Sequence, residues 1–173
     1  MERRTVVVTG GTGFLGSEIV KQLVETKIYK VVALDINPPA LGTGTFPNVH
    51  YVRANVLHPE ELDKVFQGAK PTIVIHTVGV FDVDAARYTE KNRENIFEVN
   101  VQGTKNVVAA AKSCGARGLV YTSSITVLVD QNDADFRNAD ETWPTGRAKL
   151  LYGQSKVIIF PWACYLLPLS YRR

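Results

Sequence analysis

The sequence lacks the residue spacings that mark metal sites and disulfide frameworks. Its two cysteines, Cys114 and Cys164, form no CxxC or Cys–His pattern, so we expect small buried residues in a reducing compartment. The three histidines, His50, His58 and His76, share no metal-ligand spacing, and no metal site is predicted. His76 ends an apolar run, where packing or hydrogen bonding explains a histidine better than catalysis does.

Long apolar runs and a strong imbalance of charge are also missing. No apolar run reaches the ~18 residues that cross a bilayer, so we expect no integral membrane segment. The 20 basic and 17 acidic residues are interspersed, which gives no reason to expect a nucleic acid partner. The first apolar run begins almost at the amino terminus and leaves no room for a signal peptide, which predicts a cytoplasmic protein.

What is present is an ordinary globular composition, 45% hydrophobic and 21% charged over 173 residues. Short runs rich in β-branched residues predict strands that are buried on both faces of a parallel sheet. These runs are Thr5–Thr9, Lys30–Asp35, Val49–Arg53, Thr72–Thr77 and Gly118–Ser123. Segments with helical spacing alternate with them, at Phe14–Glu25, Glu60–Phe66, about Asn92–Ser113 and from near Lys149.

The alternation of strands and helices predicts an α/β fold, a doubly wound parallel sheet of the Rossmann type. Looser stretches follow three of the strands, at Pro38–Pro47, Gly79–Lys91 and Leu128–Gly146. Because the carboxyl ends of parallel strands share one edge of the sheet, we expect a binding site along that edge.

Glycines crowd the junction between the first strand and the first helix, in the stretch VVVTGGTGFLGSEIV. A backbone that turns sharply against a pyrophosphate cannot carry Cβ atoms at the turn or at the contact, and glycine removes both clashes. Three glycines have the spacing GxxGxxG, and Gly11 offers GxGxxG as an alternative frame. The start of the helix offers free N–H groups to phosphates, so the stretch predicts a dinucleotide site. The predicted cofactor contacts here are Gly10, Gly13, Phe14, Leu15 and Gly16.

Asp35 ends the second predicted strand, about 20 residues after the glycines, where dinucleotide sites place an acid. Its carboxylate would accept hydrogen bonds from the adenosine ribose and would repel a 2'-phosphate. Ile36 and Asn37 follow and supply no cation to hold such a phosphate. The pattern predicts NAD rather than NADP. The alternative is that Asp35 is only a solvated acid in a turn.

The stretch YGQSK places Tyr152 and Lys156 at i and i+4, on one face of a predicted helix. A phenol is a poor base at neutral pH, and an adjacent ammonium favours the phenolate by lowering its pKa. Upstream, YTSS ends the fifth predicted strand with Ser123 and Ser124 at the ligand edge, where either hydroxyl could orient a substrate oxygen. Alone, YxxxK is more often a surface pair.

Taken together, TGGTGFLG, Asp35, NVQGT at residues 100–104, YTSS and YGQSK resemble the extended short-chain dehydrogenase/reductases over about residues 5–156. Within that family, IHTVG, NVQGTKNVVAAAKSCGARGLVYTSSITV and YGQSK look most similar to the 3β-hydroxysteroid and C4-decarboxylating sterol dehydrogenases. The resemblance implies an NAD-dependent enzyme that oxidises a 3β-hydroxy group of a sterol or steroid, and association with the endoplasmic reticulum for a full-length form.

The resemblance also implies roles for single residues. Ser124 would bind the carbinol oxygen, and Tyr152 would remove its proton. Lys156 would bind the nicotinamide ribose and lower the pKa of the tyrosine. Asn100 matches an asparagine near the lysine and the cofactor, with capping or polar packing in the long helix as the alternative.

One adenine contact departs from the family pattern. Asn55, followed by Val56, stands where the family usually has an aspartate that contacts adenine. An amide oxygen can still accept a hydrogen bond from the adenine amino group, so we expect weakened rather than lost binding.

The family pattern stops after residue 156, where the chain continues VIIFPWACYLLPLSYRR. Family members extend this helix and add a strand and a substrate-binding region, so the resemblance implies a C-terminally truncated protein. We predict an NAD-binding domain over residues 1–156 and an atypical apolar tail over residues 157–173. Pro161 removes a helical N–H, so we expect the helix to fray soon after Lys156 and the tail to dock incompletely. An uncovered sheet edge would then favour a homodimer or association with a membrane surface.

Two alternatives fit the same residues. Nucleotide-sugar epimerases, dehydratases and flavonol-type reductases use the same machinery on other substrates. A chain without a substrate region could also be a cofactor-binding module without useful catalysis, because the non-reacting parts of a substrate help to position its reacting carbon.

Overall fold

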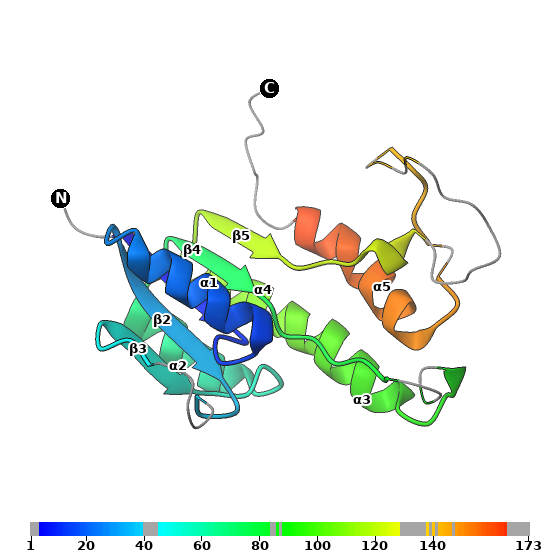
Figure 1. Ribbon diagram of the computed structural model, residues 1–173, viewed down its shortest axis with the longest axis horizontal. Coiled ribbons are helices and arrows are strands. Elements are labelled where there is room, and N and C mark those ends of the chain that lie inside the picture. Colours follow the sequence, from blue (N-terminus) through cyan, green and yellow to red (C-terminus); the bar gives the residue numbers. More distant parts are fainter. Residues whose placement is uncertain are drawn as a thin grey trace.

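The computed structural model describes residues 4–39, 45–83, 86, 88–128, 138, 140, 142–146 and 148–165, with residues 160–165 described by their backbone alone. Strands and helices alternate along the described chain as predicted, except that the third strand follows the second directly (Figure 1). The strands are β1 (Arg4–Thr9), β2 (Tyr29–Asp35), β3 (Val49–Arg53), β4 (Ile73–His76) and β5 (Gly118–Tyr121). The helical elements are α1 (Phe14–Glu25), α2 (Pro59–Ala69), α3 (Arg93–Phe97), the π-helical η2 (Glu98–Gly103), α4 (Thr104–Ser113), the 3-10 turn η3 (Ile125–Val127) and α5 (Leu151–Tyr165).

The strands form one parallel sheet in the order β3-β2-β1-β4-β5, which confirms the predicted doubly wound architecture. Figure 1 shows α1 in front of this sheet and α2 and α4 behind it. Successive residues of a strand point to opposite faces, so the β-branched runs fill two cores at once. Val7 packs with Phe66 and Val107 on one face, and Val8 packs with Val20 on the other.

The helix predicted from about Asn92 to Ser113 is interrupted by a wider turn. α3 passes into η2 and then into α4, and the Thr104 hydroxyl donates a hydrogen bond of 2.6 Å to the Asn100 carbonyl within this turn. Single π-helical turns inside α-helices are frequent at functional sites. Here the turn contains Asn100, whose side chain is fully buried.

The prediction that the last helix frays soon after Lys156 is wrong. α5 continues through Pro161 to Tyr165. A proline removes one N–H donor while the neighbouring residues keep theirs, and the fully buried Ile159 holds the turn that precedes it. The side chains of residues 160–165, that of Cys164 among them, and all of residues 166–173 lie outside the described residues. Docking of that part of the tail stays a prediction.

β5 is the outer strand of the described sheet, next to β4. Val120 on this strand is 54% exposed, so one face of β5 is uncovered by the part of the chain that the structure describes. Cys114 carries a free thiol and is half-buried. Among the described helices, none combines the length and the apolar character that crossing a membrane requires.

Candidate functional site

A cleft of about 750 Å³ opens at the carboxyl ends of the first four strands. Every cofactor contact predicted in the first half of the chain lines it. These residues are Gly10, Gly13, Phe14, Leu15, Gly16, Asp35, Asn55 and Val56. The strand order reverses between β1 and β4, and open α/β sheets bind their ligands at such a switch point.

The glycine loop leaves no room for side chains where it turns into α1. Gly10 has a φ of +74°, and a Cβ on Gly16 would lie 1.9 Å from the Gly10 carbonyl oxygen. A Cβ on Gly11 would instead meet Ala33 of β2, and Gly11 does not line the cleft. GxxGxxG is therefore the frame that faces the cleft. α1 begins directly after Gly13, so its unpaired N–H groups and this cradle fit a pyrophosphate.

Asp35 lies at the end of β2 with its carboxylate beside the glycine loop. Its two oxygens accept hydrogen bonds from the backbone N–H groups of Thr12, at 3.2 Å, and Asn37, at 3.1 Å. Sequence reasoning missed one neighbour, Arg53 of β3, whose Nε donates a hydrogen bond of 3.1 Å to the Ile36 carbonyl. Strand pairing places Asp35 directly opposite this arginine, although the two are far apart in sequence.

Asn55 is held by the start of α2. Its backbone N–H donates to Glu61 Oε2 at 2.8 Å, and its side-chain oxygen accepts from the Leu57 N–H at 3.0 Å. The second lone pair of that oxygen is left for a ligand. The amide thus has a fixed position at the rim of the cleft.

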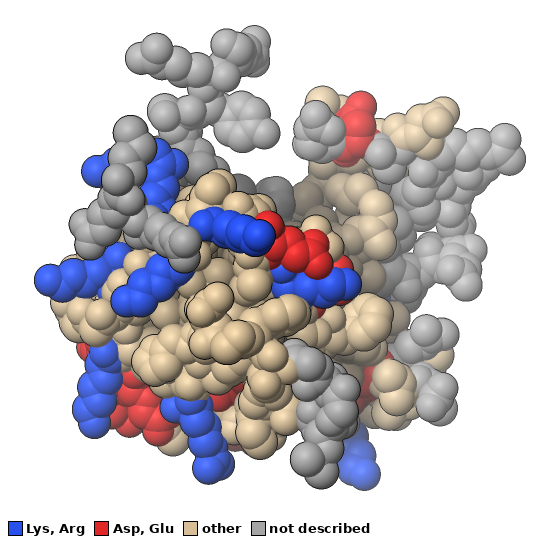
Figure 2. Space-filling model, turned by 60° about the vertical axis from the view of Figure 1, so that its left-hand side comes forward, with Lys and Arg blue, Asp and Glu red and all other residues tan. Residues whose placement is uncertain are grey.

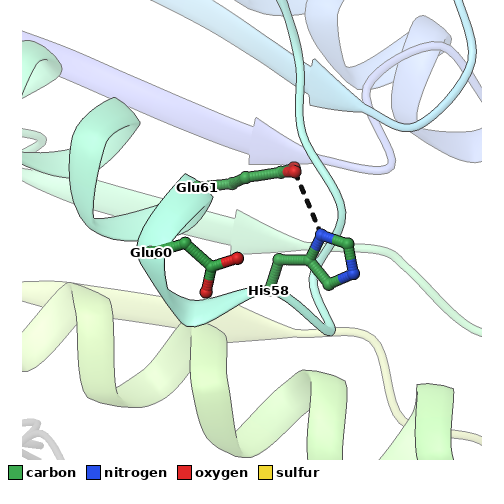
Figure 3. A group of neighbouring side chains, drawn as sticks. All are labelled: His58, Glu60 and Glu61. Carbon is green, nitrogen blue, oxygen red and sulfur yellow. Dashed lines mark hydrogen bonds and ion pairs between the residues drawn. The ribbon is translucent and has the colours of Figure 1, made fainter.

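His58 gathers with Glu60 and Glu61 at the same helix start, where their potential ligand atoms lie within 4.8 Å of one another (Figure 3). Glu61 Oε1 lies 3.0 Å from His58 Nδ1, a contact that raises the pKa of the exposed histidine and lowers that of the glutamate. Because Glu61 also binds the backbone of Asn55, we assign the cluster to ordering this loop.

Tyr152, Lys156 and Ser124 come together beyond β5, from the first turns of α5 and from the N-cap of η3. The Ser124 oxygen accepts hydrogen bonds from the Thr126 N–H, at 3.2 Å, and from the Thr126 hydroxyl, at 2.9 Å. The Ser124 hydroxyl also makes a hydrogen bond with Tyr152. Burial raises the pKa of Tyr152, and the hydrogen bond of Ser124 acts against this effect.

Lys156 is almost fully buried, close to the rings of Tyr121 and Tyr152. Its Nζ donates to the Thr122 carbonyl at 3.1 Å and lies 4.7 Å from the Tyr121 ring centre and 5.5 Å from that of Tyr152. Burial lowers the pKa of Lys156 to about 8. Burial is the larger of the effects that act on the phenol of Tyr152, and the lowering of its pKa by Lys156 stays a prediction.

Asn100 ties the site to the loop after β4. Its Oδ1 accepts from the Val80 N–H at 2.7 Å, and its Nδ2 donates to the Val80 carbonyl at 2.8 Å and to Ser155 Oγ at 3.0 Å. A Cβ built on Gly79 would lie 3.3 Å from Lys156 Nζ and 3.6 Å from Asn100 Oδ1. Asn100 is therefore both polar packing and a close neighbour of the lysine.

His76 extends this network towards the glycine loop. Because the Thr104 hydroxyl donates to Asn100, it accepts from His76 Nε2, at 2.9 Å, and His76 Nδ1 accepts from the Thr9 hydroxyl, at 2.6 Å. Burial, and then the charge of Lys156, lower the pKa of His76 to about 3. The neutral ring agrees with the expectation of hydrogen bonding rather than catalysis.

A small pocket beside Tyr152 was not predicted from the sequence. It has a volume of about 220 Å³ and includes Phe81 and Asp82 of the loop after β4. The Phe81 and Tyr152 rings lie 5.6 Å apart. The sequence marks this loop only as a looser stretch at the ligand edge, because nothing in the stretch VFDV says which side chain meets α5.

A second hollow, of about 890 Å³, lies at the opposite edge of the sheet and contains none of the predicted site residues. Arg4, Lys30, Lys70 and Arg117 are among its lining residues. On the face drawn in Figure 2, basic side chains are interspersed with acidic ones. The predicted site residues therefore lie away from this hollow.

Comparison with known proteins agrees with this geometry. Residues 7–158 match the profile of the 3-beta hydroxysteroid dehydrogenase/isomerase family. The chain belongs to this family. A 3-beta-hydroxysteroid dehydrogenase of Mycolicibacterium neoaurum is 35% identical over 155 residues, which are 88% of this chain and 40% of that protein.

Two further proteins that are similar to this chain are named for different reactions. The decarboxylating sterol-4-alpha-carboxylate 3-dehydrogenase of Saccharomyces cerevisiae is 29% identical over 89% of this chain and 44% of its own length. The UDP-glucose 4-epimerase of Thermus thermophilus, solved with NAD, has a TM-score of 0.72 and 31% identity, and covers 91% of this chain and 49% of its own. The chain thus spans less than half the length of these relatives.

Proposed function

We propose that this chain is the cofactor-binding and proton-transferring part of an NAD-dependent dehydrogenase that oxidises the 3β-hydroxy group of a sterol or steroid. The observation that carries the proposal is the meeting of Ser124, Tyr152 and Lys156 at the end of the sheet that also carries the glycine-lined cleft. Family membership supports the choice of reaction.

The residues that line the cleft have the chemistry that NAD requires. The GxxGxxG turn and the start of α1 would hold the pyrophosphate, and Asp35 would accept hydrogen bonds from the adenosine ribose. Asn55 and Val56 would border the adenine. Lys156 and Asn100 would lie beneath the nicotinamide ribose. NAD, when bound, supplies the hydride acceptor.

Proton transfer is the task of this chain's own residues. Ser124, whose hydroxyl hydrogen-bonds Tyr152, would donate its proton to the carbinol oxygen once substrate binds, and Tyr152 would take the proton of that oxygen on its phenolic oxygen. The raised pKa of Tyr152 requires a source of positive charge for the phenolate to form at neutral pH. Lys156 and the positive ring of the oxidised cofactor would supply it.

The test compares Tyr152→Phe with Tyr29→Phe, a control at the amino end of β2. With a 3β-hydroxysteroid as substrate, the rate of NAD reduction, followed by absorbance, should fall by at least about a hundred-fold in Tyr152→Phe, since general base catalysis is lost. Calorimetry should show NAD affinity within a few-fold of the original in both variants. Unchanged turnover in Tyr152→Phe would refute the mechanism.

A second candidate, epimerisation of a nucleotide sugar, is favoured by the likeness to the Thermus thermophilus enzyme. Assays with UDP-glucose beside the steroid separate the two activities. NAD binding without turnover of either compound would support the third reading, a cofactor-binding module that lacks catalysis.

A further inference from the structure

The pocket beside Tyr152 is shaped for the reacting end of a substrate. Its volume of about 220 Å³ falls below the roughly 300 Å³ at which whole-ligand pockets begin. Phe81, Ile96, Leu150 and Leu151 give it apolar walls, and Tyr152 and Gly153 of α5 close one side. A ring held there would have its carbinol at Tyr152 and its neighbouring carbons against the other walls.

Asp82 is the acidic group of this pocket. Its Oδ1 accepts a hydrogen bond of 2.6 Å from Asn92 Nδ2, which fixes the side chain. Its Oδ2 is buried and has no hydrogen-bond partner. The described residues that line the pocket include no lysine or arginine. The pocket beside Tyr152 is therefore lined by a carboxyl group with one oxygen that makes no hydrogen bond to the described residues.

The carboxyl group of Asp82 matters because relatives of this chain are named for two kinds of substrate. One is named for 3-beta-hydroxysteroids and the other for sterol-4-alpha-carboxylates. In the second kind of substrate, a carboxylate sits on C4, the carbon bonded to the reacting C3. Resting on the proposed function, we propose that Asp82 makes this chain selective for 3β-hydroxysteroids that carry no negative charge at C4. Two carboxylates in one small apolar pocket repel each other, whereas a neutral substrate does not meet this penalty.

The experiment uses the whole chain saturated with NAD and three steroids: a 3β-hydroxysteroid, its 4α-carboxylate and the methyl ester of that carboxylate. Equilibrium dialysis gives their affinities, and absorbance of reduced NAD gives their rates. We expect the carboxylate to bind at least about ten-fold more weakly than the other two. Asp82→Asn should bring the affinities for the carboxylate and for its ester together, while Asp63→Asn, on the exposed side of α2, should change nothing.

The ester separates charge from size without any variant, so the test survives a misfolded Asp82→Asn. Equal weakness of ester and carboxylate would mean steric exclusion and would overturn the proposal. Equal affinity of carboxylate and parent steroid, or no binding of any of the three, would overturn it too. Selective binding without reduction of NAD would uphold the role of Asp82 and count against the proposed activity, whereas unselective turnover would do the reverse.

Discussion

The glycine loop and the pocket beside Tyr152 differ in how far apart in the chain their residues lie. The loop is a continuous stretch between β1 and α1, and backbone sterics at its glycines constrain its shape. The pocket joins the loop after β4 to η3 and the first turn of α5, segments that are remote in sequence. A local motif can therefore be recognised residue by residue, while an assembled pocket depends on how helices dock.

The two regions also differ in what holds them. The loop is stabilised by backbone contacts that glycine permits, such as the hydrogen bond of 2.8 Å from the Gly10 N–H to the Leu34 carbonyl. The reacting region depends on buried polar side chains, with Lys156, His76 and Asn100 all withdrawn from water. Buried polar groups are costly unless each has its partner, so we expect this region to respond more strongly to pH.

The largest effect is expected at Gly16, where the loop has no room for a side chain. Gly16→Ala places a Cβ 1.9 Å from the Gly10 carbonyl oxygen and should lower the free energy of unfolding by about 3 kcal/mol. NAD binding should be lost with it. Gly68→Ala on α2, where a Cβ meets nothing within 4 Å, should instead add about 0.5 to 1 kcal/mol. Urea unfolding and calorimetry measure both, and equal stability of the two variants would contradict the steric account.

Next in size is the docking of α5 beyond Lys156. Ile159→Ala empties a fully buried site and should lower the free energy of unfolding by about 2 to 3 kcal/mol. Ile158→Ala changes a neighbour that is 44% exposed and should have less than half that effect. Guanidinium unfolding decides between them. Similar small losses in both variants would mean that α5 does not pack as described.

His76 should make stability depend on pH. Its pKa is about 3 when folded and 6.5 as the unfolded reference, so the unfolded chain binds more protons between these values. The free energy of unfolding should therefore fall as pH decreases from 6.5 towards 3, by up to about 1.4 kcal/mol per pH unit. His76→Gln should flatten this slope relative to the control His50→Gln, whose site is exposed. An unchanged slope would show that other groups carry the dependence.

The smallest effect is expected in the choice of cofactor at Asp35. Asp35→Asn removes the charge that repels a 2'-phosphate and leaves Arg53 nearby, so affinity for NADP relative to NAD should rise several-fold. Calorimetric titration of the two cofactors gives the ratio. Adding Arg53→Gln should cancel most of the gain. If neither substitution changes the ratio of the two affinities, the adenosine ribose binds away from Asp35.

Much of this protein is determined by its sequence alone. β-branched runs specify strands because their side chains pack well on a buried pleated surface, and α1 was predicted with the bounds that it has. Gly10, Gly13, Gly16 and Asp35, which line one cleft, could be predicted as a group because their constraints act over one turn and one crossover. The proximity of Tyr152 and Lys156 could be predicted because helical spacing fixes their mutual orientation.

The remaining features depend on contacts between elements that are remote in the sequence. The sequence predicted a helix that frays soon after Lys156, but α5 continues to Tyr165 and buries Ile159 fully. Arg53 reaches the neighbourhood of Asp35 through strand pairing, and Asp82 reaches the neighbourhood of Tyr152 through the docking of α5 on the loop after β4. Burial then sets the charge states, lowering the pKa of Lys156 and raising that of Tyr152. Desolvation arises from all the elements packed around a group, so it cannot be assigned to any one stretch of residues.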